Sequence, residues 1–526
     1  MSNNWWKHAV FYHIYPKSFQ DTDGDGIGDI RGIISRLGYL ADLGIDAIWL
    51  SPVYRSRMAD GGYDISDYRD IDPVFGTLAD FRELLKQAHD KGMRVMMDLV
   101  MNHTSDRHPW FVKARSSTDN PKHDWYIWHE GRNGKAPNNW RTNFLERAWR
   151  RDATTGQFYY HSFFREQPDL NWRNDNMKQA FFDNIRFWLD MGVDGFRLDV
   201  INMILKDSLL RNNPLFSRTK VYNRNQPETY GILREFRALL DEYPNTTSVG
   251  EIYVLPPGDP KLAASFIGNG NDMLHMAFDF SLLFCAWNAR RYYRAVQSYY
   301  DALHPDGWAC FFFSNHDLGR HLNRFGRTSH AREKAKLLAV FLLTLKGTPF
   351  IYYGDELGMT NARIPRRKIR DRYGKMFFPF YKGRDPGRTP MQWNTATNAG
   401  FTDGEPWLPL HQDFRKVNME SETADENSVL NTYRKMIELR KTLLALQQGE
   451  IEFVETGRNG ILSYTRTLDD RQIQILLNFS SWKKKISCWT ESDRLVFSTH
   501  RKDVENEVNF LFPFEAMALV SKKYLR

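Results

Sequence analysis

The sequence predicts an α/β protein: a (β/α)8 TIM barrel with a lobe inserted after the third strand and a C-terminal antiparallel β-domain. Eight short apolar segments recur along the chain, separated by polar clusters and helical patterns. Near-continuous apolar strands are typical of a parallel sheet that is covered on both faces. Beyond residue 447 the pattern changes to short alternating strands, which indicates a separate antiparallel sheet.

The barrel strands are expected within eight apolar segments. These are Ala9–Pro16, Ala47–Pro52, Arg94–His103, Asp194–Val200, Thr247–Ile252, Leu274–Phe280, Cys310–Asp317 and Thr348–Glu356. Between them, Leu78–Gly92 and Met177–Gly192 carry apolar residues at three- and four-residue spacing, and each ends on a glycine, which is a helix stop signal. Repeated strand–helix units of this kind predict a closed barrel.

Two long gaps in the barrel pattern set the predicted domain boundaries. Residues 103–172 are rich in Trp, Asn, Pro and His and are too many for a bare loop, so they predict an inserted domain. Residues 357–410 form a second insertion, after the eighth strand. The barrel is therefore expected to comprise residues 1–102 and 173–447, and a C-terminal β-sandwich domain residues 448–526.

Composition argues against nucleic-acid and membrane partners. The net charge of +8 comes from 72 basic and 64 acidic residues, and the densest basic runs, Arg366–Lys368 and Lys483–Lys485, do not interleave with aromatic residues. The longest strongly apolar stretch, Leu337–Leu345, is too short to span a bilayer. We therefore expect no nucleic acid and no membrane among the partners.

The cysteines favour a reducing compartment. Cys285, Cys310 and Cys488 are odd in number, lie far apart and show neither metal spacing nor a disulfide framework. The first residues lack a basic segment followed by a long apolar run, so we expect no signal peptide. Together these features predict a cytoplasmic protein.

Charged residues gather at the ends of the predicted strands. In a barrel of this kind the active site lies at the C-terminal ends of the strands. The residues found there are Asp98, His103, Arg197, Asp199, Glu251, His316 and Asp317. Buried carboxylates without partners are costly, so the cluster indicates either a structural ion-pair network around Arg197 or acid–base and nucleophilic chemistry. Paired carboxylates suit glycoside cleavage, and the abundant aromatic residues of the insertions suit stacking on sugars.

Several motifs resemble those of one enzyme family. They are "FYHIYPKSFQDTDGDGIGDIRGI", "GGYDISDYRDIDPVFGT", "MDLVMNHTSD", "QPDLNW", "GFRLDV", "GEIY", "SNHD" and "GRDPGRTPMQW", in order between residues 11 and 393. The chain thus resembles the α-amylase superfamily of retaining glycoside hydrolases (glycoside hydrolase family 13), in its α-glucosidase and oligo-1,6-glucosidase branch. The resemblance implies a retaining, exo-acting enzyme that acts on small neutral oligosaccharides, releasing glucose from the non-reducing end.

The resemblance also implies roles for particular residues. Asp199 would be the nucleophile, Glu251 the general acid/base and Asp317 the stabiliser of the transition state. The substrate-binding residues would be Asp60, Tyr63, His103, Phe163, Gln167, Arg197, Val200, His316 and Arg384. Among these, Arg197 should keep Asp199 ionised, and Glu251 should have a raised pKa because it must start protonated. An Asp60–Arg384 pair would close the pocket at the terminal sugar.

The segment "DTDGDGIGD" indicates a metal-binding loop. Asp21, Asp23 and Asp25 occupy the first, third and fifth positions of a loop similar to an EF-hand, and the carbonyl of Ile27 and the side chain of Asp29 follow. The alternative is an acidic turn without an ion. The resemblance favours a structural Ca²⁺ or Mg²⁺, and no organic cofactor is expected.

The sequence leaves open which glycosidic linkage is cleaved and whether the reaction is hydrolysis, transfer or isomerisation. In this branch a valine after the nucleophile, here Val200, is associated with α-1,6 cleavage. The stretches "RTNFLERAW" and "IPRRKIRDRYGKMFFPFYKGRD" depart from the family pattern and flank the expected acceptor side. A sucrose isomerase or trehalose synthase would share the catalytic residues, as would an enzyme with added transglucosylation. A non-catalytic carbohydrate-binding or transport-associated protein is more remote, and the expected assembly is a monomer or weak homodimer.

Overall fold

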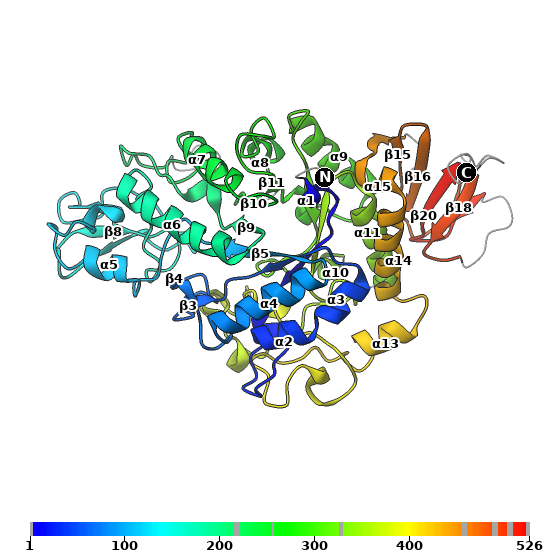
Figure 1. Ribbon diagram of the computed structural model, residues 1–526, viewed down its shortest axis with the longest axis horizontal. Coiled ribbons are helices and arrows are strands. Elements are labelled where there is room, and N and C mark those ends of the chain that lie inside the picture. The colour runs from blue at the N-terminus through cyan, green and yellow to red at the C-terminus, as the bar shows by residue number, and fades with distance from the viewer. Residues whose placement is uncertain are drawn as a thin grey trace.

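The fold is described from a computed structural model, shown in Figure 1. The structure describes residues 4–214, 221–254, 257–325, 330–454, 460–486, 493–501 and 509–521. A central barrel lies between an inserted lobe at one end of the long axis and a C-terminal β-domain at the other (Figure 1).

Eight strands form the central parallel sheet, and each lies within one of the eight expected segments. They are β1 (Phe11–Ile14), β2 (Ala47–Leu50), β5 (Arg94–Leu99), β9 (Gly195–Leu198), β10 (Thr247–Glu251), β11 (Met276–Phe278), β12 (Cys310–Phe312) and β13 (Thr348–Tyr352). Their order is β11-β10-β9-β5-β2-β1-β13-β12, with every hydrogen-bonded pair parallel. The outer strands β11 and β12 contact each other, so the sheet closes on itself and the predicted barrel is confirmed.

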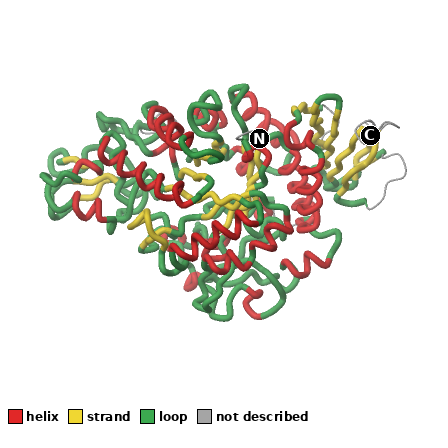
Figure 2. The backbone as a smooth tube through the Cα atoms, in the orientation of Figure 1, coloured by secondary structure: helices red, strands yellow, loops and turns green. Residues whose placement is uncertain are grey.

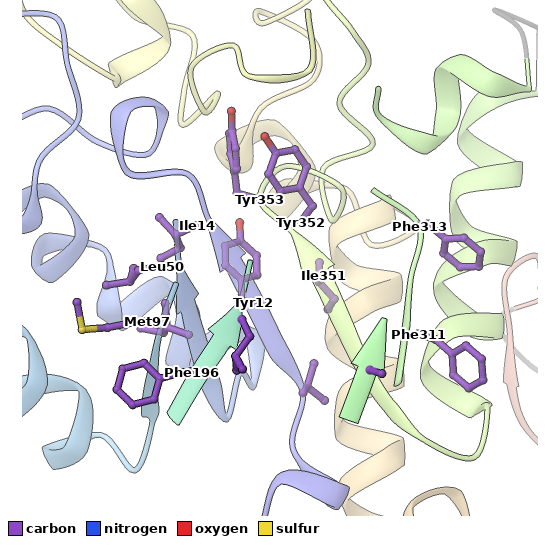
Figure 3. Packing of buried hydrophobic residues seen from close by; sticks show 14 of the residues in the cluster. Tyr12, Ile14, Leu50, Met97, Phe196, Phe311, Phe313, Ile351, Tyr352 and Tyr353 are labelled. Atoms are coloured by element: carbon purple, nitrogen blue, oxygen red, sulfur yellow. The ribbon is translucent and has the colours of Figure 1, made fainter. Parts of the chain in front are cut away.

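Alternate residues of these strands face opposite sides of the sheet, as strand geometry requires. One set, which includes Phe11, Trp49 and Phe350, forms a buried cluster of its own. The other set packs with the surrounding helices, and Figure 3 shows Tyr12, Leu50, Met97, Phe196, Phe311 and Ile351 among its members. Burial on both faces explains why these strands appear in the sequence as continuous apolar runs.

The two helices predicted in detail are present. The N-cap residue of helix α4 (Leu78–Asp90) is Thr77, whose side chain forms a capping box with Asp80. Helix α6 (Asp175–Met191) ends at Gly192, which has a φ of 102°, a left-handed conformation that glycine adopts without steric cost.

The remaining helices surround the barrel or connect its parts (Figure 2). They are α1 (Trp5–His8), α2 (Ile30–Ser35), α3 (Leu37–Leu43), α7 (Thr229–Asp241), α8 (Pro260–Ser265), α9 (Ala289–Ala302), α10 (His321–Arg324), α11 (Ala331–Thr344), α13 (Met419–Ala424), α14 (Val429–Thr442) and α15 (Leu444–Gln448). The antiparallel pair β3 (Tyr54–Ser56) and β4 (Ile65–Ile71), which the sequence analysis did not predict, follows β2.

The two insertions have secondary structure of their own. The lobe after β5 contains α5 (Pro109–Ala114) and a small antiparallel sheet of β6 (Trp128–His129), β8 (Phe158–Tyr160) and β7 (Trp149–Arg151). The insertion after β13 contains α12 (Arg372–Phe377).

The C-terminal part is antiparallel. Strands β14 (Glu450–Phe453), β15 (Ile461–Leu468), β16 (Arg471–Asn478), β20 (Ala516–Ser521) and β18 (Asp493–Ser498) form one sheet, and β17 (Lys484–Lys485) pairs with β19 (Phe510–Leu511). One face of the large sheet packs on the barrel helices. The other face packs with Ile486, which follows β17, and with Leu511 of β19.

Two sequence expectations concern membranes and cysteines. In the described ranges, every helix is too short or too polar to cross a bilayer. Cys285 and Cys310 are both unpaired, and Cys488 lies outside the described residues.

Candidate active site

A cavity of about 300 Å³ opens at the C-terminal ends of the barrel strands. Its walls come from the barrel, the inserted lobe and the insertion after β13. The lining residues are Asp60, Tyr63, His103, Asn143, Phe144, Phe163, Asp199, Val200, Glu251, Tyr253, Val254, Phe280, Phe284, Asp317, Leu318, Tyr373, Tyr381 and Arg384. The three carboxylates expected to converge, from β9, β10 and β12, therefore meet in one cavity.

Arg197 lies at the centre of the carboxylate cluster and is almost fully buried. Its Nη1 donates to Oδ1 of Asp98 and to Oδ1 of Asp199, both at 2.8 Å. Its Nη2 donates to Oε2 of Glu251. The structure thus contains the ion-pair network that the sequence allowed, with both expected reacting carboxylates as members of it.

The pKa values of Asp199 and Glu251 are both displaced upward. Burial raises the pKa of Glu251, Arg197 opposes the shift, and the nearby Asp317 adds to it, as expected for a general acid. Burial also raises the pKa of Asp199 well above its ordinary value, and here too Arg197 opposes the shift without cancelling it. The charge of Arg197 thus acts on the pKa of Asp199 in the direction that the sequence analysis expected.

Asp317 has a different environment. Its Oδ1 accepts from Nη2 of Arg388 at 2.9 Å and from Nη1 of Arg384 at 3.3 Å. Burial alone would raise the pKa of Asp317, but His316, Arg384 and Arg388 together hold it far below its ordinary value. Asp317 is therefore the carboxylate of the site that stays ionised most firmly.

Tyr63 and His316 form one side of the site. The Tyr63 hydroxyl donates to Oδ2 of Asp98 at 3.0 Å and lies 2.6 Å from Nε2 of His316. The two rings are parallel, with centroids 5.3 Å apart. Burial holds the pKa of His316 well below its ordinary value, so its ring is neutral and available for hydrogen bonding.

His103, Gln167 and Phe163 come from the start of the lobe and from its return to the barrel. The Gln167 Nε2 lies 2.9 Å from Nε2 of His103 and donates to Oδ2 of Asp60 at 3.2 Å. The His103 and Phe163 ring centroids are 5.1 Å apart. Burial lowers the pKa of His103 to about 4. All the predicted substrate-binding residues thus lie in or beside the cavity.

Asp60 and Arg384 form the ion pair that the sequence analysis expected. Nη2 of Arg384 donates to Oδ1 of Asp60 at 2.6 Å and to Oδ1 of Asp371 at 2.9 Å. The exposed fractions of the Arg384 and Asp60 side chains are 13% and 5%, so these are not surface charges.

Val200 has an unusual backbone. Its φ of 38° and ψ of 44° lie in the left-handed region, which is strained for a β-branched residue. Its backbone N–H points to Oε2 of Glu251 at 3.4 Å. Strain of this kind is typical of functional sites, and here it lies directly after Asp199.

The acidic loop gathers part of the predicted ligand set. Carboxylate oxygens of Asp21, Asp23 and Asp29 lie within 4.8 Å of one another, while Asp25 is not part of that group. Asp21 accepts backbone hydrogen bonds from residues 23, 24 and 26, which wraps the loop around it. Burial and the neighbouring carboxylates raise the pKa of Asp25. Three clustered carboxylates fit a hard divalent cation.

The sequence analysis assigned no role to some residues that the structure brings to the site. Asp98 was noted at a strand end, and Arg388 lies in the quoted motif "GRDPGRTPMQW", so position and motif could have indicated both. The aromatic lining is different, because Phe144, Tyr373 and Tyr381 come from the two stretches that depart from the family pattern. No spacing signal in the sequence pointed to them.

The fold and the site together define a class of protein. A parallel (β/α)8 barrel with two neighbouring carboxylates at its C-terminal face, an ionised third and an aromatic cavity has the architecture of a glycoside hydrolase. The family model described as "Alpha amylase, catalytic domain" matches residues 13–449. The chain therefore belongs to the α-amylase family, glycoside hydrolase family 13, and is an enzyme of that family.

Individual relatives agree with this assignment. The chain is 41% identical to an oligo-1,6-glucosidase of Parageobacillus thermoglucosidasius, over 96% of this chain and 95% of the relative. It is 44% identical to a probable α-glucosidase of Rhizobium meliloti (strain 1021), over 91% and 90%.

Solved structures match over nearly the whole chain. The α-glucosyl transfer enzyme XgtA matches with a TM-score of 0.91 and 38% identity, over 98% of this chain and 99% of that chain. The trehalulose synthase MutB of Pseudomonas mesoacidophila MX-45 matches with the same TM-score and 34% identity, over 99% and 100%.

Proposed function

We propose that the protein is a retaining, exo-acting α-glucosidase that releases glucose from the non-reducing end of short α-glucosides, including α-1,6-linked oligosaccharides. The Asp60–Arg384 ion pair carries the proposal, because it lies in the same cavity as Asp199 and Glu251. A buried charged pair can bind the hydroxyls of a terminal sugar and blocks passage of a longer chain. The relatives named oligo-1,6-glucosidase and α-glucosidase support the same activity.

The residues can carry out a double displacement. Asp199 attacks the anomeric carbon while Glu251 donates its proton to the leaving oxygen, which forms a glucosyl ester on Asp199. Glu251 then takes a proton from water, the water oxygen bonds to the same carbon, and the bond to Asp199 breaks. Asp317 stays ionised beside the positive charge that develops on the sugar.

Product analysis tests the proposal. The wild-type enzyme is incubated with p-nitrophenyl α-glucoside, isomaltose, maltose, sucrose and trehalose, and the products are identified. We expect glucose from the aryl glucoside and from isomaltose. Absence of glucose release from every α-glucoside, or release of oligosaccharides from the interior of a long chain, would overturn the proposal.

Val200 supports cleavage of α-1,6 links, because in this branch a valine follows the nucleophile of enzymes with that activity. The relative rates on isomaltose and maltose measure this preference directly. Equal or higher activity on maltose would assign the enzyme a mixed or α-1,4 preference instead.

A second candidate is a glucosyl transferase or isomerase similar to a sucrose isomerase or trehalose synthase. The match to a trehalulose synthase favours it, as do the eight Phe and Tyr residues in the cavity lining, whose apolar surface disfavours water. With sucrose as substrate, an isomeric disaccharide as the main product would support this candidate, whereas glucose and fructose would support hydrolysis. A non-catalytic binding role is less favoured, because the complete carboxylate set is present.

We further propose that Asp21, Asp23 and Asp29, with Asp25 and the carbonyl of Ile27, bind a structural Ca²⁺ or Mg²⁺. The cluster of three carboxylates supports the proposal. The ion would hold the loop after β1 and takes no part in the reaction. No organic cofactor is needed for the chemistry above.

A cytoplasmic location and a monomer or weak homodimer complete the proposal. The unpaired Cys285 and Cys310 support a reducing compartment. Analytical ultracentrifugation at several concentrations tests the assembly state, and a stable tetramer would contradict it.

A further inference from the structure

We propose that a bridge between the inserted lobe and the insertion after β13 walls the cavity and restricts the enzyme to short substrates. The bridge consists of Phe144, Phe164 and Glu166 in the lobe and Arg372 and Tyr373 in the insertion. This inference rests on the proposed α-glucosidase activity. It concerns the chain length of the substrate, which the reacting carboxylates do not determine.

The aromatic part of the bridge forms cavity wall. The rings of Phe144 and Tyr373 have centroids 4.8 Å apart, and both residues line the cavity. Phe144 stacks on Phe164 at 4.3 Å with an interplanar angle of 24°. On the other side, Tyr373 meets Tyr381, a further lining residue, edge-on at 5.2 Å. The lobe and the insertion are therefore joined by continuous ring contacts beside the substrate site.

The ionic part of the bridge supports these ring contacts. Nη1 of Arg372 donates to Oε2 of Glu166 at 2.8 Å, and the Glu166 side chain is only 9% exposed. The Arg372 guanidinium also lies over the Phe164 ring, 4.5 Å from its centroid. Burial would raise the pKa of Glu166, but hydrogen bonds from Arg372 and Arg165 lower it overall. Glu166 is therefore ionised at neutral pH and forms this ion pair with Arg372.

The first residues of α12 connect the bridge to the end of the pocket. Asp371, the residue before this helix, accepts from Nη2 of Arg384 at 2.9 Å, and Arg384 holds Asp60. Three consecutive residues thus make three different contacts. Asp371 contacts the pocket end, Arg372 contacts the lobe, and Tyr373 forms part of the cavity wall. The insertion cannot move away from the lobe without breaking these contacts together.

The size of the cavity indicates what the bridge excludes. Its volume of about 300 Å³ is at the lower end of ligand sites. Phe144 belongs to the stretch 141–149 and Arg372 and Tyr373 to the stretch 364–385, which are the two stretches that depart from the family pattern. The bridge is therefore built from residues outside the motifs that this chain shares with the family.

Two substitutions open the bridge, and two more serve as controls. Tyr373→Ala removes the ring from the wall, and Arg372→Met keeps an alkyl chain while removing the ion pair. Arg165→Met removes the other partner of Glu166, at 3.1 Å, without touching the insertion. Phe380→Ala alters the same insertion at a side chain that is 98% exposed and does not line the cavity.

The measurement is the ratio of kcat/KM on a tetrasaccharide to kcat/KM on the disaccharide, in each linkage series that the wild type cleaves. The ratio should be well below one for the wild type and for both controls. It should rise about threefold or more in Tyr373→Ala and in Arg372→Met, because each variant removes a contact that holds the wall of the cavity in place.

Two results would overturn the inference while leaving the proposed function intact. One is a wild-type enzyme that cleaves the tetrasaccharide as well as the disaccharide. The other is an unchanged ratio in both bridge variants that still hydrolyse the disaccharide. A wild-type enzyme without activity on any α-glucoside would overturn the proposed function, and the inference with it.

Discussion

Removal of either member of the Asp60–Arg384 pair should cause a steep loss of activity on short substrates. Two exposed charges would contribute at most about 1 kcal/mol as a salt bridge. The structure places both side chains in the cavity wall instead, with Asp60 5% exposed and Arg384 13% exposed. Asp60→Ala and Arg384→Ala therefore each remove a buried charge from the end of the pocket that the proposed function assigns to the terminal sugar.

The expected magnitude follows from the hydrogen bonds that are lost. A hydrogen bond to a charged group contributes about 1.5–3 kcal/mol, which corresponds to a fall of about 10–150-fold in kcat/KM. Arg384→Ala should also destabilise the fold, because Arg384 pairs with Asp60 and with the buried Asp371. Breaking a buried ion pair from one side costs about 3–5 kcal/mol. Asp60→Ala leaves the Arg384–Asp371 contact in place and should therefore be the milder change in stability.

The assay measures kcat/KM on isomaltose and p-nitrophenyl α-glucoside, together with the melting temperature of each variant. The loss should appear on both substrates, because both carry the same terminal glucose. Values within twofold of wild type for both variants would refute the assignment of this pair to the end of the pocket. A melting temperature that falls more in Asp60→Ala than in Arg384→Ala would refute the ion-pair reasoning separately.

Four further results are expected. Asp199→Asn should abolish turnover with the fold intact by circular dichroism, and ordinary activity in a preparation free of wild-type enzyme would contradict its role as nucleophile. Proton NMR should show the α-anomer of glucose first, because retaining carboxylates stand about 5–5.5 Å apart; the β-anomer first would exclude retention. Excess EDTA should lower the melting temperature of the wild type, while Asp21→Ala should be less stable and insensitive to EDTA, because an ion bound only to the folded state stabilises it. An unchanged wild-type melt, with a trapped ion excluded, would remove support for the metal. Burial raises the pKa of Glu356 from 4.5 to about 7. Protonated Glu356 therefore contributes fully to the free energy of unfolding below pH 4.5, and this contribution is lost as the pH rises through 7. Between pH 4.5 and pH 7 the free energy of unfolding, measured by chemical denaturation, should fall by about 3 kcal/mol less in Glu356→Gln than in the wild type. Parallel curves of stability against pH for the two proteins would argue against this prediction.

The barrel could be predicted from the sequence because its physical signal is local. A strand buried on both faces requires an uninterrupted apolar run, and each of the eight runs contains a strand. The pair β3 and β4 was missed because it lacks such a local signal. Its residues Tyr54–Ser56 and Ile65–Ile71 are only partly buried, and β-bulges interrupt their register, so no regular alternation marks them.

The site also contains residues that a local pattern could predict and contacts that it could not. Residues at strand ends, such as Asp199 and Glu251, could be placed together because the barrel determines where strand ends meet. The contact between Phe144 and Tyr373 joins residues 229 positions apart on two insertions, whose packing is not determined by any periodic pattern. Such contacts arise from tertiary structure alone, and they are the ones on which the substrate-length inference depends.

In the carboxylate cluster of the site, one cation is shared among several buried acids. One guanidinium faces the three carboxylates Asp98, Asp199 and Glu251, all of them buried. Burial raises the pKa of each, and the charge of Arg197 acts in the opposite direction. Asp317 accepts from its own cations, Arg384 and Arg388, and its charge adds to the upward pKa shifts of Asp199 and Glu251. The retaining mechanism proposed above requires a proton on Glu251 and none on Asp199 before the sugar is cleaved. Because Asp199 and Glu251 share Arg197 as a partner, the apparent pKa values in a pH–activity profile would belong to the pair and not to either residue alone.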